Sequence, residues 1–401
     1  MDIQYSTSAD ALFSAISDSR ANTTATLSNA ALSRGIDLYQ NGDYEGAVVA
    51  FKSVIGLEMN QGTDNAVNAY NYAGMAYIQL GQPDNAIKTY KAALQIDPLD
   101  DAMHIALGNV FYDQNDYANA EKEYKAAINL NSQSATNWYS LGQAYLAGNK
   151  YDEAQNAFAK VTQVSSQDYS GYYGLGQVAY KRGDNNDAIK LFNQVLGMKR
   201  DFNAAYVDLG YAYADSGDID QARQQLKNLN YSGDTDSANL LSSYIQKVSP
   251  PEIMAAYTTG GFNVGLGPGT NLSDLDPSLS SPDSSAYFTM NFIFSKDMDA
   301  TSVQNPYNWQ ISKAAYGTPG GAYNWGLPAS SSDSFIALTP VSVVYKSDYL
   351  TAELTFQLTQ NDNADGTIDP SHIIFKFNGK DAYGNAISPT ADEYGGFSKI
   401  V

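Results

Sequence analysis

Oxygen-bearing side chains crowd one short stretch of the chain, residues 361–372, which reads NDNADGTIDPSH. The candidate ligands are Asn361, Asn363, Asp365 and Asp369. Their spacing, with Gly366 in the sixth place, is that of a calcium-binding loop, and calcium prefers several oxygen ligands. Two positions disagree with this interpretation: Asn361 replaces the usual first Asp, and His372 stands in the twelfth place, where a bidentate Glu is needed.

The same stretch also has the composition of a turn. Gly366 supplies a positive φ without steric cost, and Asp and Asn side chains bond loop amides without a metal. The stretch directly precedes an alternating run, HIIFKFNG, that is typical of a strand. We therefore expect a turn, and calcium bound by the four candidate ligands is the alternative.

The rest of the chain offers little that could catalyse a reaction. There is no cysteine, which excludes disulfides, thiolate metal sites and cysteine nucleophiles. Of the two histidines, His104 falls on a helical position that is normally buried, and His372 begins a predicted strand. The glycine-rich GLGPG at 265–269 precedes no helix and carries no lysine, unlike a phosphate-binding loop. We expect no catalytic residue, no enzymatic activity and, calcium aside, no cofactor.

Composition indicates a globular, acidic chain with more than one domain. At 401 residues it is too long for one ordinary core, and 43% hydrophobic residues suffice for folding. The net charge of −20, with only 23 basic residues, argues against nucleic acid or an anionic membrane as partner. No apolar run approaches the roughly 18 residues that span a bilayer. We expect neither nucleic-acid binding nor membrane insertion.

The first thirty residues lack the basic and apolar regions of a secretory signal. The wealth of Tyr, Ser, Asn, Asp and Gly, with little Lys and Arg, is more typical of a surface or extracellular bacterial protein. We expect an extracellular or cell-surface location, reached by a leaderless route or as a mature chain. A cytoplasmic or periplasmic location is the alternative.

Small residues recur through the first half of the chain with a fixed period. Glycines fall 34 residues apart, at Gly74, Gly108, Gly142, Gly176 and Gly210. Alanines follow the same period, at Ala86, Ala120, Ala154, Ala188 and Ala222. A looser copy precedes them, with Gly35 and Phe51. Each copy has two apolar stripes at helical spacing separated by a polar turn, so each predicts a helical hairpin.

These copies resemble the tetratricopeptide repeat over about residues 28–236. The fourth copy carries the family signature at Trp138, Leu141, Gly142, Tyr145, Tyr151, Ala154 and Phe158. The resemblance implies an all-α solenoid of about six hairpins, because one hairpin cannot bury its apolar face alone. We expect a solenoid over 28–248 ending in a capping helix at 237–248. Residues 1–27 are expected to form an N-terminal cap, with a short amphipathic helix at 9–20, or a leader.

After residue 248 the helical spacing gives way to short alternating runs, which are typical of an antiparallel sandwich. We expect a linker and first strand over 249–284 and an all-β sandwich over 285–401. The second part resembles the Ig-like domain of bacterial surface-layer and adhesive proteins. The matching positions are Phe294, Ser295, Lys296, Met298, Asp299, Asn305, Trp309, Lys380, Asp381, Gly384 and Asn385. Residues 316–334 depart from that family as an inserted loop.

The tetratricopeptide resemblance also implies a binding surface, because the inner helix of each hairpin lines the concave face in that family. The corresponding residues are Tyr39, Asn71, Met75, Tyr112, Tyr139, Gln143, Tyr173, Gln177, Tyr180 and Tyr211. Such a tyrosine-rich groove suits a protein or peptide held by apolar contact and hydroxyl hydrogen bonds. The alternative is that these tyrosines pack against one another, the N-terminal segment or the second domain.

These expectations combine into a non-enzymatic protein–protein interaction scaffold. We expect a structural component of a bacterial cell-surface or extracellular assembly, self-associating through exposed sheet edges or stacked solenoid ends. The alternative is an intracellular or periplasmic adaptor in envelope or appendage biogenesis.

Overall fold

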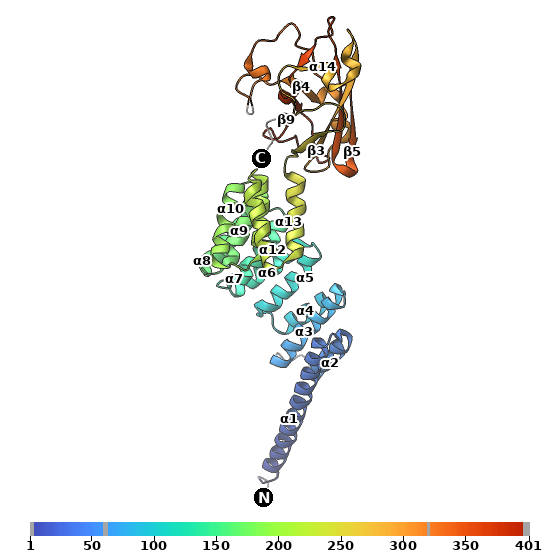
Figure 1. The fold of residues 1–401 in the computed structure, drawn as a ribbon. Helices are drawn as coiled ribbons and strands as arrows, with labels where there is room; N and C mark the ends of the chain where they lie inside the picture. Colours follow the sequence, from blue (N-terminus) through green and yellow to red (C-terminus); the bar gives the residue numbers. More distant parts are fainter. Residues whose placement is uncertain (1–3, 59–62, 319–320, 396–401) are drawn as a thin grey trace. The chain divides into compact units, whose positions relative to one another are not determined.

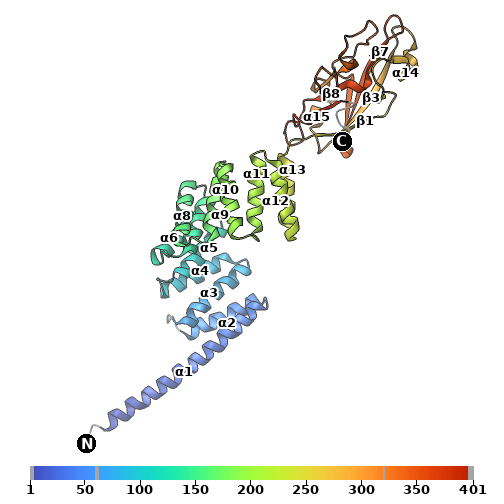
Figure 2. The same ribbon diagram turned by 60° about the vertical axis from the view of Figure 1, so that its left-hand side comes forward.

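The computed structural model describes residues 4–58, 63–318 and 321–395 (Figures 1 and 2). The chain divides into two compact units, Met1–Ser216 with Asn228–Asp234, and Gly217–Lys227 with Thr235–Val401. The first is helical, and the second contains every strand of the described residues together with the helix Thr235–Val248, part of the helix before it, and the short helices α14 (Leu272–Leu275) and α15 (Ala300–Val303). None of the helices in the described ranges has both the length and the apolarity that crossing a bilayer requires.

Antiparallel helices follow one another in hairpins, as the 34-residue period predicts (Figure 1). They are α1 (Gln4–Gln40), α2 (Tyr44–Leu57), α3 (Asp64–Gln79), α4 (Pro83–Ile96), α5 (Asp101–Asp113), α6 (Tyr117–Leu130), α7 (Ala135–Ala147), α8 (Tyr151–Val164), α9 (Tyr169–Arg182), α10 (Asn185–Met198), α11 (Asn203–Asp215), α12 (Ile219–Ser232) and α13 (Thr235–Val248).

The N-terminal region differs from the expected short cap. Helix α1 runs unbroken for 37 residues, so the short helix expected at 9–20 is part of one long helix. No glycine or proline interrupts the sequence before Gly35, which removes the usual signals that end a helix. Thr23, Thr24 and Thr26 turn their hydroxyls to carbonyl oxygens four residues back, so these polar side chains are satisfied within the helix.

The periodic glycines set the distance between the two helices of each hairpin. A Cβ added to Gly142 would lie 2.6 Å from the ring of Phe158, and one added to Gly74 would lie 2.3 Å from the ring of Tyr90. The same contact recurs at Gly35 with Phe51, Gly108 with Tyr124 and Gly176 with Phe192. All five rings are buried, so a glycine opposite an aromatic ring is the repeating unit of the solenoid core.

The turn inside each hairpin repeats one backbone conformation. The residue that follows the first helix by one or two places has a positive φ, and the chain supplies Gly or Asn there, which tolerate it best. These residues are Gly81, Asn115, Asn149, Gly183 and Gly217, again 34 apart.

The second unit carries two main sheets and a two-stranded ladder. Its strands are β1 (Ile253–Thr258), β2 (Thr270–Asn271), β3 (Ser285–Phe294), β4 (Trp309–Lys313), β5 (Ser342–Lys346), β6 (Thr351–Thr359), β7 (Thr367–Ile368), β8 (Ile373–Phe377) and β9 (Glu393–Gly395). One sheet has the order β1-β3-β6-β5, the other β4-β8-β9, and β2 pairs with β7. All the ladders are antiparallel.

Aromatic rings fill the space between the two sheets. Phe292 of β3 contacts Phe375 of β8 with ring centroids 5.6 Å apart, and Phe294 contacts Phe377 at 5.4 Å. Trp309 at the start of β4 is 1% exposed and donates its indole N–H to the carbonyl of Val303. The predicted fold class, a helical solenoid followed by an all-β sandwich, is therefore confirmed.

The two motifs that carried the Ig-like resemblance meet in space. Lys296 and Asp381 form an ion pair at 2.6 Å, with side chains 4% and 0% exposed. Both motifs also reach the end of α13: Lys296 donates to the carbonyl of Ser249, and Asn385 to that of Lys247. Contacts therefore join α13 to the sheets, whereas we expected the border of the solenoid at residue 248.

Candidate protein-binding groove

The odd-numbered helices lie on the inner side of the helical stack. Each contacts the next odd-numbered helix directly, from α1 with α3 through α9 with α11, whereas the even-numbered helices lie farther from one another. In a curved stack the closely spaced helices line the concave face. The predicted groove residues fall on α1, α3, α5, α7, α9 and α11 and thus on this inner set.

A ladder of hydrogen bonds crosses three of these helices. On α7, the Gln143 amide donates to the hydroxyl of Tyr139 at 2.9 Å and to Oε1 of Gln177 on α9 at 3.2 Å. Gln177 in turn donates to the carboxylate of Asp208 on α11 at 3.4 Å. Gln143 and Gln177 stand 34 residues apart, so the repeat itself places the two amides side by side.

The partial burial of the Asp208 carboxylate costs free energy, because the charged group loses contact with water. It is half-buried, and this burial raises its pKa even though hydrogen bonds from Tyr173 and Gln177 and the charge of Lys181 act to lower it. The described part of the chain gives Asp208 no ion-pair partner. Its negative charge is therefore available to a hydrogen-bond donor or a cation that enters the groove.

Tyr173 differs from the expectation that it lines the groove. Its ring is 9% exposed and packs between Phe192 and Phe202, at centroid distances of 5.9 and 4.8 Å. Burial and the neighbouring Asp208 raise the pKa of its hydroxyl. Tyr173 thus belongs to the buried core, because its ring has an aromatic neighbour on both sides. Its hydroxyl group donates to the carboxylate of Asp208 and so orients that side chain.

The other predicted residues keep part of their surface exposed. Met75 is 36% exposed, and the remaining members of the set are half-buried. Tyr139 rests on Phe158 with centroids 5.6 Å apart, and Tyr39 contacts Tyr44 and Tyr72. Tyr180 donates to Asp215 at 2.8 Å. These tyrosines therefore have one packed edge and one accessible edge. They pack against neighbouring rings, as one alternative predicts, and still line the groove, as the other predicts.

Sequence reasoning missed Asp208. The family pattern did not place its position in the groove, but one signal was present: the equivalent residues of the two preceding copies are Ser140 and Gly174. Packing of the repeat does not require a charged residue at the position of Asp208, since a small residue is sufficient there in the two preceding copies.

We expect Asp208→Asn to raise the melting temperature at neutral pH by roughly 2 °C. A carboxyl whose pKa is raised on folding stabilises the fold when protonated and loses that stabilisation as pH rises through the folded pKa, and Asn has no such charge. The gain should vanish in acid, below the ordinary pKa of Asp. Calorimetry of both chains across this pH range measures it, and an equal gain at every pH would contradict the burial of charge as its cause.

Three of the four candidate calcium ligands, Asn361, Asp365 and Asp369, form hydrogen bonds with other groups of the protein. Asn361 and Asp365 bond each other, with the Asn361 amide donating to Asp365 at 2.7 Å and the Asp365 amide donating back at 3.0 Å. Asp369 is fully buried and accepts from the Asn324 backbone and the Ser371 hydroxyl instead. Within the described residues no three His, Asp or Glu side chains converge as metal ligands. The geometry favours the turn.

We therefore expect the melting temperature to change by less than about 1 °C between millimolar calcium and excess chelator, because Asn361, Asp365 and Asp369 already bond groups of the protein. Differential scanning calorimetry in the two buffers checks this. A larger rise with calcium, lost in Asp365→Asn, would restore the calcium hypothesis.

The two histidines both have structural partners. His104 Nδ1 lies 2.8 Å from Glu123, and His372 Nδ1 lies 2.8 Å from Asp369. Ser371 approaches the same Nδ1 of His372 at 2.9 Å and is itself buried. In a Ser-His-Asp triad the two partners face opposite nitrogens of the ring, so this cluster is not a nucleophilic site.

Comparison with known proteins places the repeats in a family. Residues 74–115 and 108–148 match a family model described as TPR repeat, and residues 135–168 and 179–242 match two described as tetratricopeptide repeat. The helical part of the chain is thus a tetratricopeptide-repeat solenoid. No curated protein matches the chain.

Several solved structures resemble the same part. MamA is 26% identical, with 41% of this chain and 96% of that chain covered and a TM-score of 0.37. The Pseudomonas aeruginosa PilF structure is 17% identical, with 55% and 99% covered and a TM-score of 0.44. YrrB, described as a TPR protein with an unusual peptide-binding site, is 17% identical, with 48% and 98% covered and a TM-score of 0.37.

Proposed function

We propose that the protein is a non-enzymatic scaffold whose concave groove binds a segment of a protein partner. The observation that carries the proposal is the hydrogen-bonded ladder from Tyr139 to Asp208. It lines up amide, hydroxyl and carboxylate groups across three helices, and its last member, Asp208, forms no ion pair among the described residues. The tetratricopeptide fold of the helical part supports this role.

The ladder also specifies the chemistry of the segment. Backbone N–H and C=O groups of an extended peptide match alternating amides and hydroxyls. A basic side chain or an amino terminus would pair with Asp208, whose charge is otherwise destabilising where it lies. The preformed groove lowers the ordering cost of binding because its side chains already bond one another.

Loss of the ladder tests the groove. We expect Gln143→Ala combined with Gln177→Ala to reduce the yield of cross-linked partners from native cells by about tenfold, the effect of removing a central hydrogen-bonding pair. Lys190→Ala on α10 is the matched control, since that side chain is 76% exposed on an even-numbered helix and pairs only with Asp187 within the described residues. Recovery of the same partners in the same amounts from the double variant would refute the groove.

We further propose that the β sandwich is an Ig-like spacer or adhesive module in a cell-surface or extracellular assembly. The meeting of the two resemblance motifs at Lys296 and Asp381 supports the Ig-like assignment. Protease shaving of intact cells tests location: release of fragments from untreated cells supports it, and protection until lysis favours the intracellular or periplasmic adaptor.

Self-association is part of the same proposal, because β5 ends one sheet and leaves a row of backbone groups that a further strand could pair with. Light scattering over a wide concentration range should show a mass that rises with concentration. A constant monomer mass would remove this part of the proposal.

A further inference from the structure

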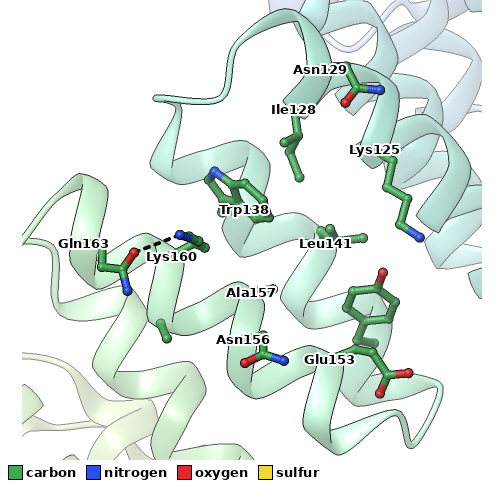
Figure 3. A pocket seen from close by; sticks show the side chains of 12 residues that line it. Lys125, Ile128, Asn129, Trp138, Leu141, Glu153, Asn156, Ala157, Lys160 and Gln163 are labelled. Carbon is green, nitrogen blue, oxygen red and sulfur yellow. Dashed lines mark hydrogen bonds between the residues drawn. The ribbon is translucent and has the colours of Figure 1, made fainter.

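A second recess is formed by the even-numbered helices α6 and α8 together with α7. A cavity of about 590 Å³ opens between α6 and α8, with α7 as its floor (Figure 3). Trp138 and Leu141 of α7 and Ile128 of α6 give it an apolar lining, and Lys160 and Glu153 of α8 stand at its rim. Its volume falls in the range of cavities that hold small ligands or single large side chains.

The repeat register explains why the cavity opens in this copy. Ala157 faces the cavity, and at the same place the neighbouring copies carry larger side chains, namely Thr89, Glu123, Leu191 and Gln225. In the preceding copy Glu123 closes the space by bonding His104, which stands where this copy has Trp138. The fourth copy thus combines the largest side chain at the position of Trp138 with the smallest side chain at the position of Ala157.

Lys160 is the second departure from the repeat. The equivalent residues are Ala92, Ala126, Gln194 and Asn228, all uncharged. Its ammonium group donates to Oε1 of Gln163 at 3.0 Å, and among the described residues no carboxylate pairs with it. The other lysine of the rim, Lys125, is by contrast paired with Glu121 at 2.6 Å.

What distinguishes Lys160 is its place at the rim of the cavity, where the other copies carry an uncharged residue. A carboxylate could have been supplied from within the chain, yet at this rim the carboxylate of Glu153 lies on the same helix seven residues away, about 10 Å along its axis. The rim of α8 therefore carries opposite charges at Lys160 and Glu153, and Lys160 is the one with which a carboxylate of a bound segment can pair.

We propose that this cavity binds a protein segment in which a large apolar side chain stands next to a carboxylate. The apolar side chain fills the space over Trp138 that Ala157 leaves free, and the carboxylate pairs with Lys160. The site lies outside the concave groove and does not depend on it, so one chain can hold two different segments at once.

Short peptides test both features. The probes are acetyl-Gly-Phe-Glu-Gly-amide, its Gln analogue without the charge, and acetyl-Gly-Ala-Glu-Gly-amide without the ring. Binding to the full chain is followed by NMR at the indole N–H of Trp138, which donates to Ser132 O at 2.9 Å and is assigned by its loss in Trp138→Phe. We expect the Phe-Glu peptide to bind at least five times more tightly than either analogue.

Two variants separate the roles. Lys160→Gln, the residue found in the next copy, should remove the preference for Glu over Gln while apolar binding remains. Ala157→Leu, also found in the next copy, should abolish binding of all three peptides, with circular dichroism confirming its fold. The Gln143→Ala/Gln177→Ala variant should bind the peptides unchanged.

Three results would overturn the proposal: no shift at Trp138 with any peptide, an intact preference for Glu in Lys160→Gln, or binding that survives Ala157→Leu. Loss of peptide binding in the groove variant would also overturn it, because the peptides would then lie in the groove. Failure of this site leaves the groove untouched, since the two use different residues and are tested by different variants.

Discussion

Lys296→Met should lower the free energy of unfolding of the β sandwich by about 3–5 kcal/mol, the usual cost of removing one partner of a buried ion pair. The pair with Asp381 is almost completely buried, so the substitution leaves a carboxylate with no cation. Burial by itself would raise the pKa of Asp381, yet hydrogen bonds from Lys296 and Asn385 lower it overall. The ionised form of Asp381 thus depends strongly on its pair with Lys296.

The lowered pKa fixes the pH dependence of the native chain. A carboxyl with a depressed folded pKa stabilises the fold above its unfolded pKa and loses that contribution as pH falls through the folded value. The sandwich of the native chain should therefore lose stability in acid more steeply than that of Lys296→Met.

Urea unfolding measures this, followed by the fluorescence of the buried Trp309 in a Trp138→Phe/Trp325→Phe background. Lys346→Met is the control: its pair with Glu353 is also 2.6 Å long but half exposed and screened by water, so its loss should lower the stability far less. Equal effects of the two substitutions would show that burial does not decide the strength of the pair.

Gly142→Ala should destabilise the solenoid by about 1–3 kcal/mol, although alanine favours helices. The added methyl group would lie 2.6 Å from the ring of Phe158, which is fully buried and cannot move away without displacing its own neighbours. Because each copy contacts only the next ones, the strain should weaken the whole stack.

The same substitution at Gly197 is the matched control. Gly197 lies in α10 with nothing within 4 Å of an added Cβ, so alanine there should stabilise by about 0.5–1 kcal/mol. Thermal unfolding followed by circular dichroism at the helical band compares the two. The prediction is wrong if both substitutions shift the transition in the same direction.

The repeat explains how much of the fold could be predicted. A glycine opposite an aromatic ring recurs at 34 residues, so the helices, their turns and their inner faces all follow from one copy. The strands of the sandwich were equally clear, since runs such as that ending in Phe294 alternate. The long α1 was not, because the short amphipathic helix predicted at 9–20 does not by itself indicate a helix that continues to Gln40, and only the absence of Gly and Pro before Gly35 indicates its continuity.

The sites depend on what differs between copies, and a family pattern describes only what is shared. Tyr139 and Gln143 could be placed in the groove by register, but the burial of Tyr173 depends on Phe202, which comes from the next copy. Asp208 gains its role from a bond to Gln177 on another helix. Such contacts join residues about one repeat apart, so no single copy of the sequence contains them.

The hydrogen bonds from the sandwich to the end of α13 determine where the chain can be divided. Lys296 and Asn385 terminate that helix from a distance in sequence, acting on the carbonyls of Ser249 and Lys247 in place of a C-cap residue. A β fragment that begins at Ser249 would lose the carbonyl of Lys247, which accepts from Asn385, and the helix that both side chains terminate. The sandwich should therefore be transferred to another protein together with α13 and with Gly217–Lys227, which belong to the same compact unit.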